Sequence, residues 1–143
     1  MGMNGMDMLR AVEDGQLKPP PIFALMGITM SRCGDGWAEL ELEVGGRHHN
    51  SMGMAHGGVV ATLGDAVMGT ALITTLREGE LFTTLELHTN YIRPARDGKL
   101  SAKGQVVRRG RSTAYCEAEI KDAQGRLVAK LSSACLIQQG QWS

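Results

Sequence analysis

The chain has 143 residues, of which 43% are hydrophobic and 21% charged, as is typical of a soluble globular protein with one sizeable core. Its 15 basic and 15 acidic residues give a formal net charge of zero, which argues against a nucleic-acid binder that works by broad phosphate neutralisation. Three cysteines at wide spacings, without a C-x-x-C pair, indicate neither a disulfide framework nor a thiolate zinc site. The first ten residues lack the pattern of a secretory signal, so we expect a cytoplasmic protein.

The N-terminal third of the chain contains a short helix and two strands in our prediction. Residues 6–14 are expected to form the helix, and the KPPP stretch at 18–21 prevents its continuation. The apolar stretch IFALMGITM, residues 22–30, is expected to be a first, irregular strand. In WAELELEV, residues 37–44, apolar residues alternate with glutamates, which is typical of a half-buried antiparallel strand.

Residues 57–76 form a long run that is almost free of charge, and we interpret it as a buried helix of about 30 Å rather than a membrane span. Its apolar residues occupy most of the circumference, so burial is expected nearly all round. Many small residues lie between them and allow a sheet or a partner helix to approach closely. Each interior glycine costs about 1 kcal/mol of helix propensity, which packing must offset.

The rest of the chain predicts strands joined by tight turns, which contain Pro94, Asp97-Gly98 and Gly110. Strands are predicted at residues 83–92, 99–109, 112–122 and 126–138, and the first and third of them alternate between two faces. One helix among antiparallel strands predicts an α+β fold, most simply a curved antiparallel sheet wrapped around the central helix. We expect a single domain over residues 1–143, with its core at about 21–138.

Asp65 is the only charged residue between positions 57 and 76. An unpaired carboxylate in an apolar environment is costly and tends to take up a proton. One interpretation is that Asp65 faces solvent or makes a structural hydrogen bond. The other is that it lines a cleft or a subunit interface, and the absence of a polar face on this helix favours that second interpretation.

Gly57 and Gly58 stand where this helix is expected to begin. The first N–H groups of a helix have no internal partner and carry the positive end of its dipole. Glycine leaves these amides bare, so that a ligand carbonyl can reach them as in an oxyanion hole. The alternative is that the glycines only ease packing at the junction. Asn50, in the preceding loop, either orients a water or a carbonyl group or is a turn residue.

Other chemistries lack their motifs. His48 and His49 are adjacent, and no histidine spacing is typical of a metal site, so we predict no metal and no cofactor. Neither a G-x-S-x-G elbow nor a phosphate-binding loop is present. A cysteine nucleophile is not supported either, because no cysteine is expected near the site and Cys116 and Cys135 alternate as core residues.

The pattern N-x-x-G-x-x-H-G-G-x-x-x-x-L-x-D is formed by Asn50, Gly53, His56, Gly57, Gly58, Leu63 and Asp65. It resembles the hotdog-fold acyl-CoA thioesterases of the phenylacetate-pathway type, in the 4-hydroxybenzoyl-CoA thioesterase superfamily. The resemblance continues through LELHTNYIRPARDGKLSAKGQVVRRGR and EIKDAQGRLVAKLSSA and covers roughly residues 21–136. It implies the hotdog fold, in which a curved sheet surrounds a long helix.

The resemblance also implies an assembly and a set of roles. Two subunits join their sheets edge to edge in a homodimer, two dimers commonly form a homotetramer, and the site lies between the subunits of a dimer. The Gly57 N–H would polarise the thioester carbonyl, and Asn50 would place the thioester or the attacking water. Asp65 of the partner subunit would act as general base or nucleophile, Thr84 would assist the water, and His56 would shape the loop through a ring hydrogen bond.

Coenzyme A carries phosphates that require cations near the mouth of the cleft. Basic residues lie in the strand and turn region that follows the helix, and simple solvent exposure is an equally good account of them. The candidates for substrate binding are His56, Gly58, Arg93, Arg108 and Arg109, with Arg96 and Arg111 nearby in the sequence. The acyl preference stays open between aryl, medium-chain and branched groups.

The sequence therefore predicts an acyl-CoA thioesterase without partners among nucleic acids or membranes. The alternative is a hotdog module that binds acyl-CoA without turning it over, as a sensor or scaffold. The complete set of Asn50, Gly57 and Asp65 argues against this alternative, because a pure binder needs no base. The dehydratase branch of the fold uses a histidine–carboxylate pair in another arrangement, which this motif does not match.

Overall fold

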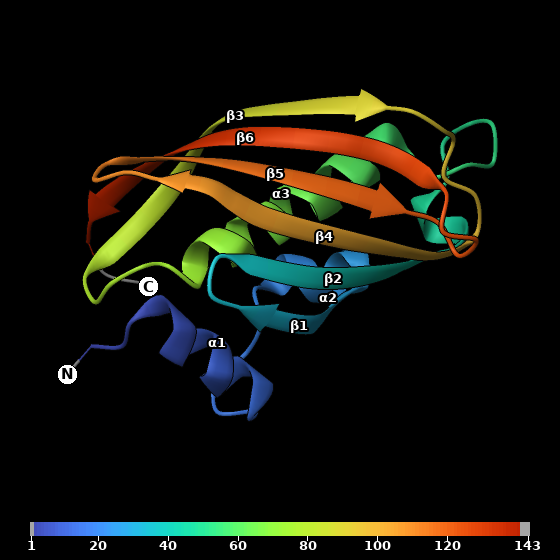
Figure 1. Cartoon of the computed structure of the whole chain (residues 1–143). Helices are drawn as coiled ribbons and strands as arrows, with labels where there is room; N and C mark the ends of the chain where they lie inside the picture. The colour runs from blue at the N-terminus through green and yellow to red at the C-terminus, as the bar shows by residue number, and fades with distance from the viewer. Residues whose placement is uncertain (1, 141–143) are drawn as a thin grey trace.

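The structure of the chain is a computed structural model that describes residues 2–140 (Figure 1). The elements in chain order are α1 (Gly5–Glu13), α2 (Pro21–Met26), β1 (Ile28–Gly34), β2 (Trp37–Val44), the 3-10 helix η1 (Gly46–His48), α3 (Gly57–Ile73), β3 (Glu80–Tyr91), β4 (Gly98–Arg109), β5 (Thr113–Lys121) and β6 (Leu127–Gln139).

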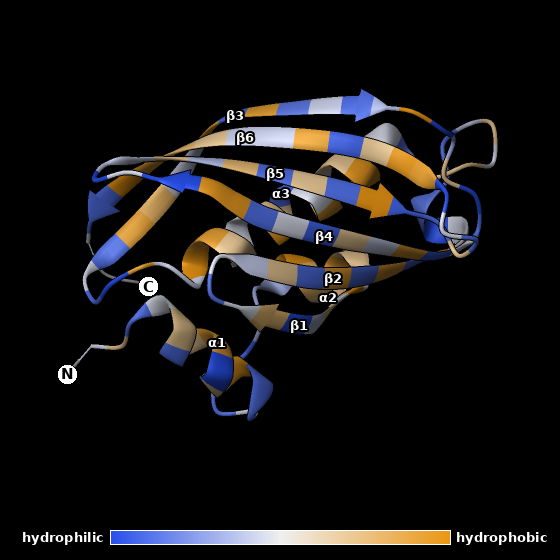
Figure 2. Cartoon of the chain, in the orientation of Figure 1, coloured by the Kyte–Doolittle hydropathy of each residue, from blue (hydrophilic) through white to orange (hydrophobic). Residues whose placement is uncertain are grey.

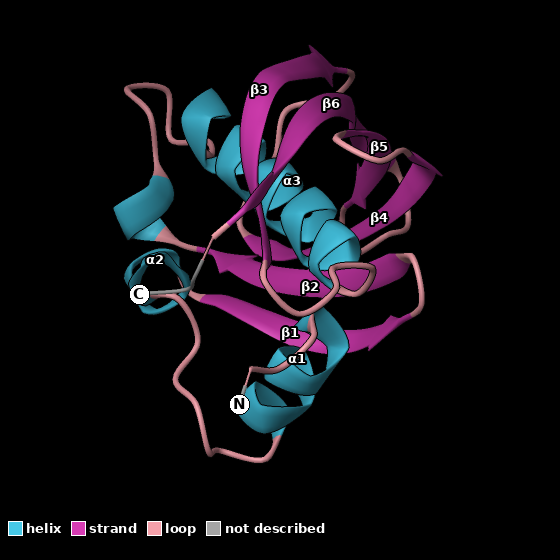
Figure 3. Ribbon diagram, turned by 90° about the vertical axis from the view of Figure 1, so that its left-hand side faces the viewer, coloured by secondary structure: helices cyan, strands magenta, loops and turns pink. Residues whose placement is uncertain are grey.

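All six strands belong to one antiparallel sheet, in the order β1-β2-β4-β5-β6-β3. The sheet curves around α3, which lies along its concave face (Figures 1 and 3). This arrangement confirms the predicted α+β architecture with a sheet wrapped around a central helix. Strands β1 and β3 are its two edges, and the outer side of β3 has no strand beside it within residues 2–140.

The core lies between the concave face of the sheet and α3. Polar and apolar residues alternate along the strands (Figure 2), as the sequence predicts for β2 and β5. Leu40, Leu42 and Ile120 from the sheet and Leu63 and Leu72 from α3 are each at most 1% exposed. Complete burial of such a side chain contributes about 1.5–3 kcal/mol, so this layer supplies most of the stabilisation of the fold.

The N-terminal segment confirms one prediction and corrects another. Helix α1 forms as expected, and the Asn4 side chain caps it by accepting the N–H of Asp7 at 2.8 Å. The predicted strand over residues 22–30 is wrong, because its first half is helix α2 and β1 begins only at Ile28. Pro21 stands at the first position of α2, where its fixed φ suits a helix, and Gly27 closes the helix at φ 78°.

Helix α3 has 17 residues and ends at Ile73, three residues before the predicted end at position 76. After it, the hydroxyls of Thr74 and Thr75 donate to carbonyls of the last turn at 2.6 and 2.7 Å. The helix is not buried on every side, because Asp65 and Gly69 form part of a partly exposed stripe beside β3. No helix within residues 2–140 has the length and apolarity that a membrane crossing requires.

Strand β3 contains one irregularity in its pairing with β6. Thr84 pairs with Cys135 and Glu86 pairs with Ala134. The chain therefore advances two residues along β3 while it advances one residue along β6. Leu85 is the extra residue, and it is 61% exposed. This is the pattern of a β-bulge, in which the extra residue interrupts the ladder and bends the strand locally.

Gly104 of β4 tests how closely the sheet approaches α3. A Cβ atom on Gly104 would lie 2.8 Å from the carbonyl oxygen of Val67, which is backbone and cannot turn away. We expect Gly104→Ala to lower the free energy of unfolding by about 1–3 kcal/mol, measured by urea denaturation. Gly46→Ala is the control, because a Cβ atom on Gly46 would meet no neighbouring atom within 4 Å. Equal stability of the two variants would contradict this packing argument.

Candidate active site

The first N–H groups of α3 differ in whether they have an acceptor. The His56 ring accepts the N–H of Gly58 through Nδ1 at 2.9 Å, and the His56 carbonyl accepts the N–H of Val59 at 2.9 Å. The N–H of Gly57 has no acceptor in the described part of the chain. At the positive end of a long helix, this N–H is therefore the one available to bind a carbonyl oxygen or an anion.

Tyr91 contacts the same glycine and was not among the residues that the sequence singled out. Its hydroxyl donates to the Gly57 carbonyl at 2.6 Å, and its ring lies where a side chain on Gly57 would be. The two residues are 34 positions apart. A tyrosine at the end of an alternating strand gives no sequence signal of such a contact.

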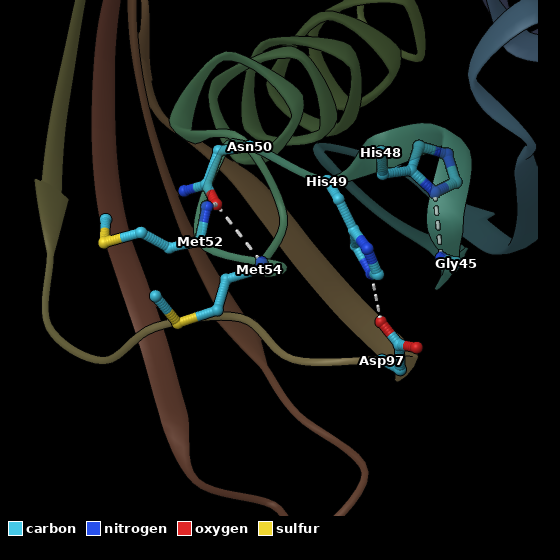
Figure 4. Close-up of polar contacts among 7 residues, drawn as sticks. All are labelled: Gly45, His48, His49, Asn50, Met52, Met54 and Asp97. Carbon is cyan, nitrogen blue, oxygen red and sulfur yellow. Dashed lines mark hydrogen bonds and ion pairs between the residues drawn. The ribbon is translucent and has the colours of Figure 1, made fainter.

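Asn50 has a structural role on one side of its amide group. Its Oδ1 accepts the N–H groups of Met52 and Met54 at 2.9 and 3.2 Å, and Figure 4 shows the side chain turned into its own loop. The interpretation as a turn residue is thus confirmed. Among the hydrogen bonds of residues 2–140, none uses Nδ2 of Asn50, so this donor is left for another partner.

Two neighbouring histidines hold the loop that carries Asn50. His48 is buried, its Nδ1 accepts the Gly45 N–H at 3.1 Å, and its Nε2 contacts the Met26 carbonyl at 2.8 Å. Because Nδ1 accepts and Nε2 faces a carbonyl, the proton belongs on Nε2. His49 contacts the Asp97 carboxylate at 2.5 Å (Figure 4). These contacts give both histidines structural positions.

Asp65 lies beside Thr84 at the middle of α3. The Thr84 hydroxyl donates to Oδ1 of Asp65 at 3.2 Å. Asp65 is only partly buried, so it is not sealed inside the core, as its interpretation as a cleft or interface residue requires. The contact joins α3 to the open edge strand β3.

A cysteine also lies close to this pair, which corrects the expectation that none would. Cys135 is opposite Thr84 in the sheet, and its Sγ is 4.0 Å from the Thr84 hydroxyl oxygen. Burial raises the pKa of the Cys135 thiol, and the negative charge of Asp65 acts in the same direction. The thiol therefore stays protonated near neutral pH, which is unfavourable for a nucleophile.

One chain does not bring all the predicted residues together. Asp65 follows Gly57 by eight residues on one helix, so the two backbones are about 12 Å apart along the axis. The structure instead forms two separate groups, Gly57 with Tyr91 and Asp65 with Thr84. Each group joins α3 to β3.

The arginines that follow one another in the sequence are also divided. Arg93 precedes β4 and donates to the Leu127 carbonyl at 3.0 Å, whereas Arg108 and Arg109 stand at the far end of that 12-residue strand. Arg109 pairs with the buried carboxylate of Glu80, which gives it a structural partner. Arg108 is exposed and makes no ion pair within residues 2–140. The arginines therefore do not form one patch on a single chain.

Comparison with known proteins gives a consistent result. The family model described as "Thioesterase superfamily" matches residues 52–129. The proofreading thioesterase EntH of Cronobacter sakazakii is 31% identical over 113 residues, which cover 78% of this chain and 82% of that protein.

Solved structures extend this similarity to the fold. The crystal structure of a thioesterase from Haemophilus influenzae superposes with a TM-score of 0.81 at 26% identity and covers 87% of each chain. The PaaI protein from the phenylacetic acid degradation operon of E. coli is similar in fold, with a TM-score of 0.85 at 20% identity over 96% of this chain and 99% of that one.

The capping role of His56 yields a stability prediction. We expect His56→Ala to lower the free energy of unfolding by about 0.5–2 kcal/mol, because Gly58 loses the acceptor of its N–H. His56→Asn keeps a side-chain acceptor at the N-cap and should retain most of the stability. Urea denaturation followed by circular dichroism measures both. An equal loss in the two variants would mean that the ring acts by packing rather than by capping.

Proposed function

Because the chain belongs to the thioesterase superfamily and is a thioester hydrolase, we propose that it hydrolyses acyl-CoA to a free acid and CoA. The observation that carries the proposal is the chemistry present along the open side of α3. A bare N–H at Gly57 suits the oxyanion of a tetrahedral intermediate, and the helix contributes a single carboxylate, Asp65. Thioester hydrolysis needs such a donor together with a base.

The distance between Gly57 and Asp65 supports a site shared by two chains. Strand β3 is an open edge, and its Leu85 and Leu87 are 61% and 38% exposed, which favours burial against a second copy. We propose that two β3 strands pair about a two-fold axis near Leu87. Such an axis exchanges the Tyr91 end with the Thr84 end, so that Asp65 of the partner subunit approaches Gly57. Two such dimers then form a homotetramer.

The reaction in this site proceeds through a tetrahedral intermediate. The Gly57 N–H binds the thioester carbonyl oxygen, and the helix dipole stabilises the negative charge that develops there. Nδ2 of Asn50 orients the thioester or the water. Asp65 either removes a proton from the attacking water as a general base or attacks the carbonyl itself, while the Thr84 hydroxyl orients the carboxylate or the water. The C–S bond then breaks, and the CoA thiolate takes up the proton that Asp65 removed from the water. If Asp65 attacks instead, the thiolate takes up a proton from solvent, and water hydrolyses the mixed anhydride to release the acid and restore the carboxylate.

Binding of the CoA portion involves the two ends of the sheet. The proposed two-fold axis brings the Arg108 end of one chain beside the Gly57 end of the other, where Arg93 also lies. We therefore propose that Arg93 of one chain and Arg108 of the other chain bind CoA phosphates. Arg109 supports this region indirectly, since its guanidinium is paired with Glu80. His56 and Gly58 shape the thioester end of the cleft through their mutual hydrogen bond.

Asp65→Asn tests the chemistry of the proposal. We expect the rate of thiol release from hexanoyl-CoA and phenylacetyl-CoA to fall by about 100-fold or more, because the amide is neither a base nor a nucleophile. Ellman's reagent measures the release, and size-exclusion chromatography checks that the oligomer is retained. Glu119→Gln, which removes an exposed carboxylate of β5, is the matched control and should keep full activity. Full activity of Asp65→Asn would refute the mechanism.

Mixed dimers of Asp65→Asn and Asn50→Ala chains test whether the site is shared. If Asn50 and Asp65 act from different subunits, one of the two sites in a mixed dimer keeps both residues, and about half of the wild-type activity returns. If each chain contains a complete site, every site in the mixed dimer lacks one residue and no activity returns. Two affinity tags, one on each chain, isolate the mixed species.

Arg108→Gln tests the binding of CoA phosphates. We expect KM for hexanoyl-CoA to rise about 3- to 10-fold, as the loss of a charge-assisted contact predicts, with little change in kcat. KM for hexanoyl-pantetheine, which lacks the nucleotide, should not change. Lys130→Gln, which removes an ammonium group that is paired with Glu119, is the control for a general loss of positive charge. An equal effect of Arg108→Gln on both substrates would contradict the assignment.

A further inference from the structure

The backbone at the start of α3 is intrinsically flexible, because two glycines stand there. Gly57 and Gly58 have no side chains, and glycine is the residue with the widest choice of backbone dihedrals. An N–H that stabilises a developing oxyanion is effective only when it already points at the site before reaction. The backbone around Gly57 must therefore be held by groups outside the glycine pair.

The hydrogen bonds on either side of Gly57 supply two of these restraints. Before it, the His56 carbonyl, which shares a peptide unit with the Gly57 N–H, accepts the Val59 N–H at 2.9 Å. After it, the Gly58 N–H donates to the His56 ring at 2.9 Å. These bonds fix the peptide unit before Gly57 and the nitrogen that follows it.

The third restraint comes from Tyr91. Its hydroxyl donates at 2.6 Å to the Gly57 carbonyl, which belongs to the same peptide unit as the Gly58 N–H, so this unit is held at both its oxygen and its nitrogen. With both units fixed, the two dihedral angles of Gly57 have little freedom, and its N–H keeps one direction. Tyr91 itself is fixed to the sheet by its pairing with Ala129 of β6.

The surroundings of Tyr91 indicate that this contact does not serve the core. The residue is 54% exposed, so its hydroxyl is not needed to satisfy a buried group. Oη and Cζ of Tyr91 lie 3.2 and 3.3 Å from the position of a Cβ on Gly57, so the ring covers that side of the glycine. An exposed tyrosine that is bonded to the backbone beside the bare N–H has the position of a residue that orients this N–H.

We propose that Tyr91 is a positioning residue for thioester hydrolysis, which fixes the Gly57 N–H in the direction that the oxyanion requires. This inference rests on the proposed function, in which the Gly57 N–H binds the reacting carbonyl. The charge on that oxygen develops in the transition state, so loss of the hydroxyl should act mainly on kcat and not on KM.

Tyr91→Phe is the direct test, because it keeps the ring and removes only the donor. With hexanoyl-CoA and phenylacetyl-CoA as probes, we expect kcat to fall about 3- to 10-fold and KM to change less than about 2-fold. Tyr115→Phe is the matched control, since Tyr115 is also an exposed tyrosine of the sheet and none of the hydrogen bonds of residues 2–140 uses its hydroxyl. The control should match the wild type in both constants.

A second readout does not depend on activity. In protein labelled with 15N-glycine, the backbone order parameter of Gly57 from 15N relaxation should fall in Tyr91→Phe and stay unchanged in Tyr115→Phe. The urea midpoint of Tyr91→Phe should stay close to that of the wild type. A large drop of this midpoint together with an unchanged Gly57 order parameter would indicate a purely structural role and overturn the inference.

The Asp65→Asn variant distinguishes a failure of the inference about Tyr91 from a failure of the proposed function. If Asp65→Asn is inactive while Tyr91→Phe has wild-type kcat and KM, the inference about Tyr91 is wrong and the proposed function stands. If Tyr91→Phe raises KM at constant kcat, the hydroxyl binds the ground state and the positioning role is also wrong. If Asp65→Asn is fully active, the proposed function fails whatever Tyr91→Phe does.

Discussion

The close approach of α3 to the sheet is the constraint on which the rest of the structure depends. At some positions of α3, backbone or side-chain atoms of the strands occupy the space in which a larger helix residue would place its own side chain. Gly104 of β4 lies against the Val67 backbone, and Gly64 of α3 receives the side chain of Leu131. Gly64, which weakens α3 as an isolated helix, is thus one of the residues that let the sheet close around it.

The enclosure is incomplete on one side, and the candidate site lies there. The sheet ends at β3, which leaves Asp65 partly exposed between the helix and a strand whose outer edge has no partner within residues 2–140. A carboxylate on an apolar helix is tolerated at this position because it has a hydroxyl partner and partial access to solvent. The same opening exposes Leu87, so the surface that we propose for the substrate and the surface that we propose for a second subunit adjoin each other.

The sequence predicts the parts of this molecule that depend on local pattern. The alternation in β2 and the charge-free run of α3 specify the layers, and the motif from Asn50 to Asp65 identifies the thioesterase superfamily that the comparisons show. Helix α2 was missed because six residues are too few for a period, and its ends depend on single proline and glycine residues. The contact of Cys135 with Thr84 depends on strand register, which no local pattern contains. The catalytic roles remain proposals.

The extra residue in β3 decides which side chains can face the helix. Successive residues of a strand point to opposite faces, so Thr84 and Tyr91, seven positions apart, would lie on opposite faces of a regular strand. The bulge at Leu85 adds one residue without a partner and reverses the alternation beyond it. Both side chains therefore reach α3, one beside Asp65 and the other beside Gly57. The bulge in β3 thus places both side chains of the proposed site, Thr84 and Tyr91, on the face of the strand that contacts α3.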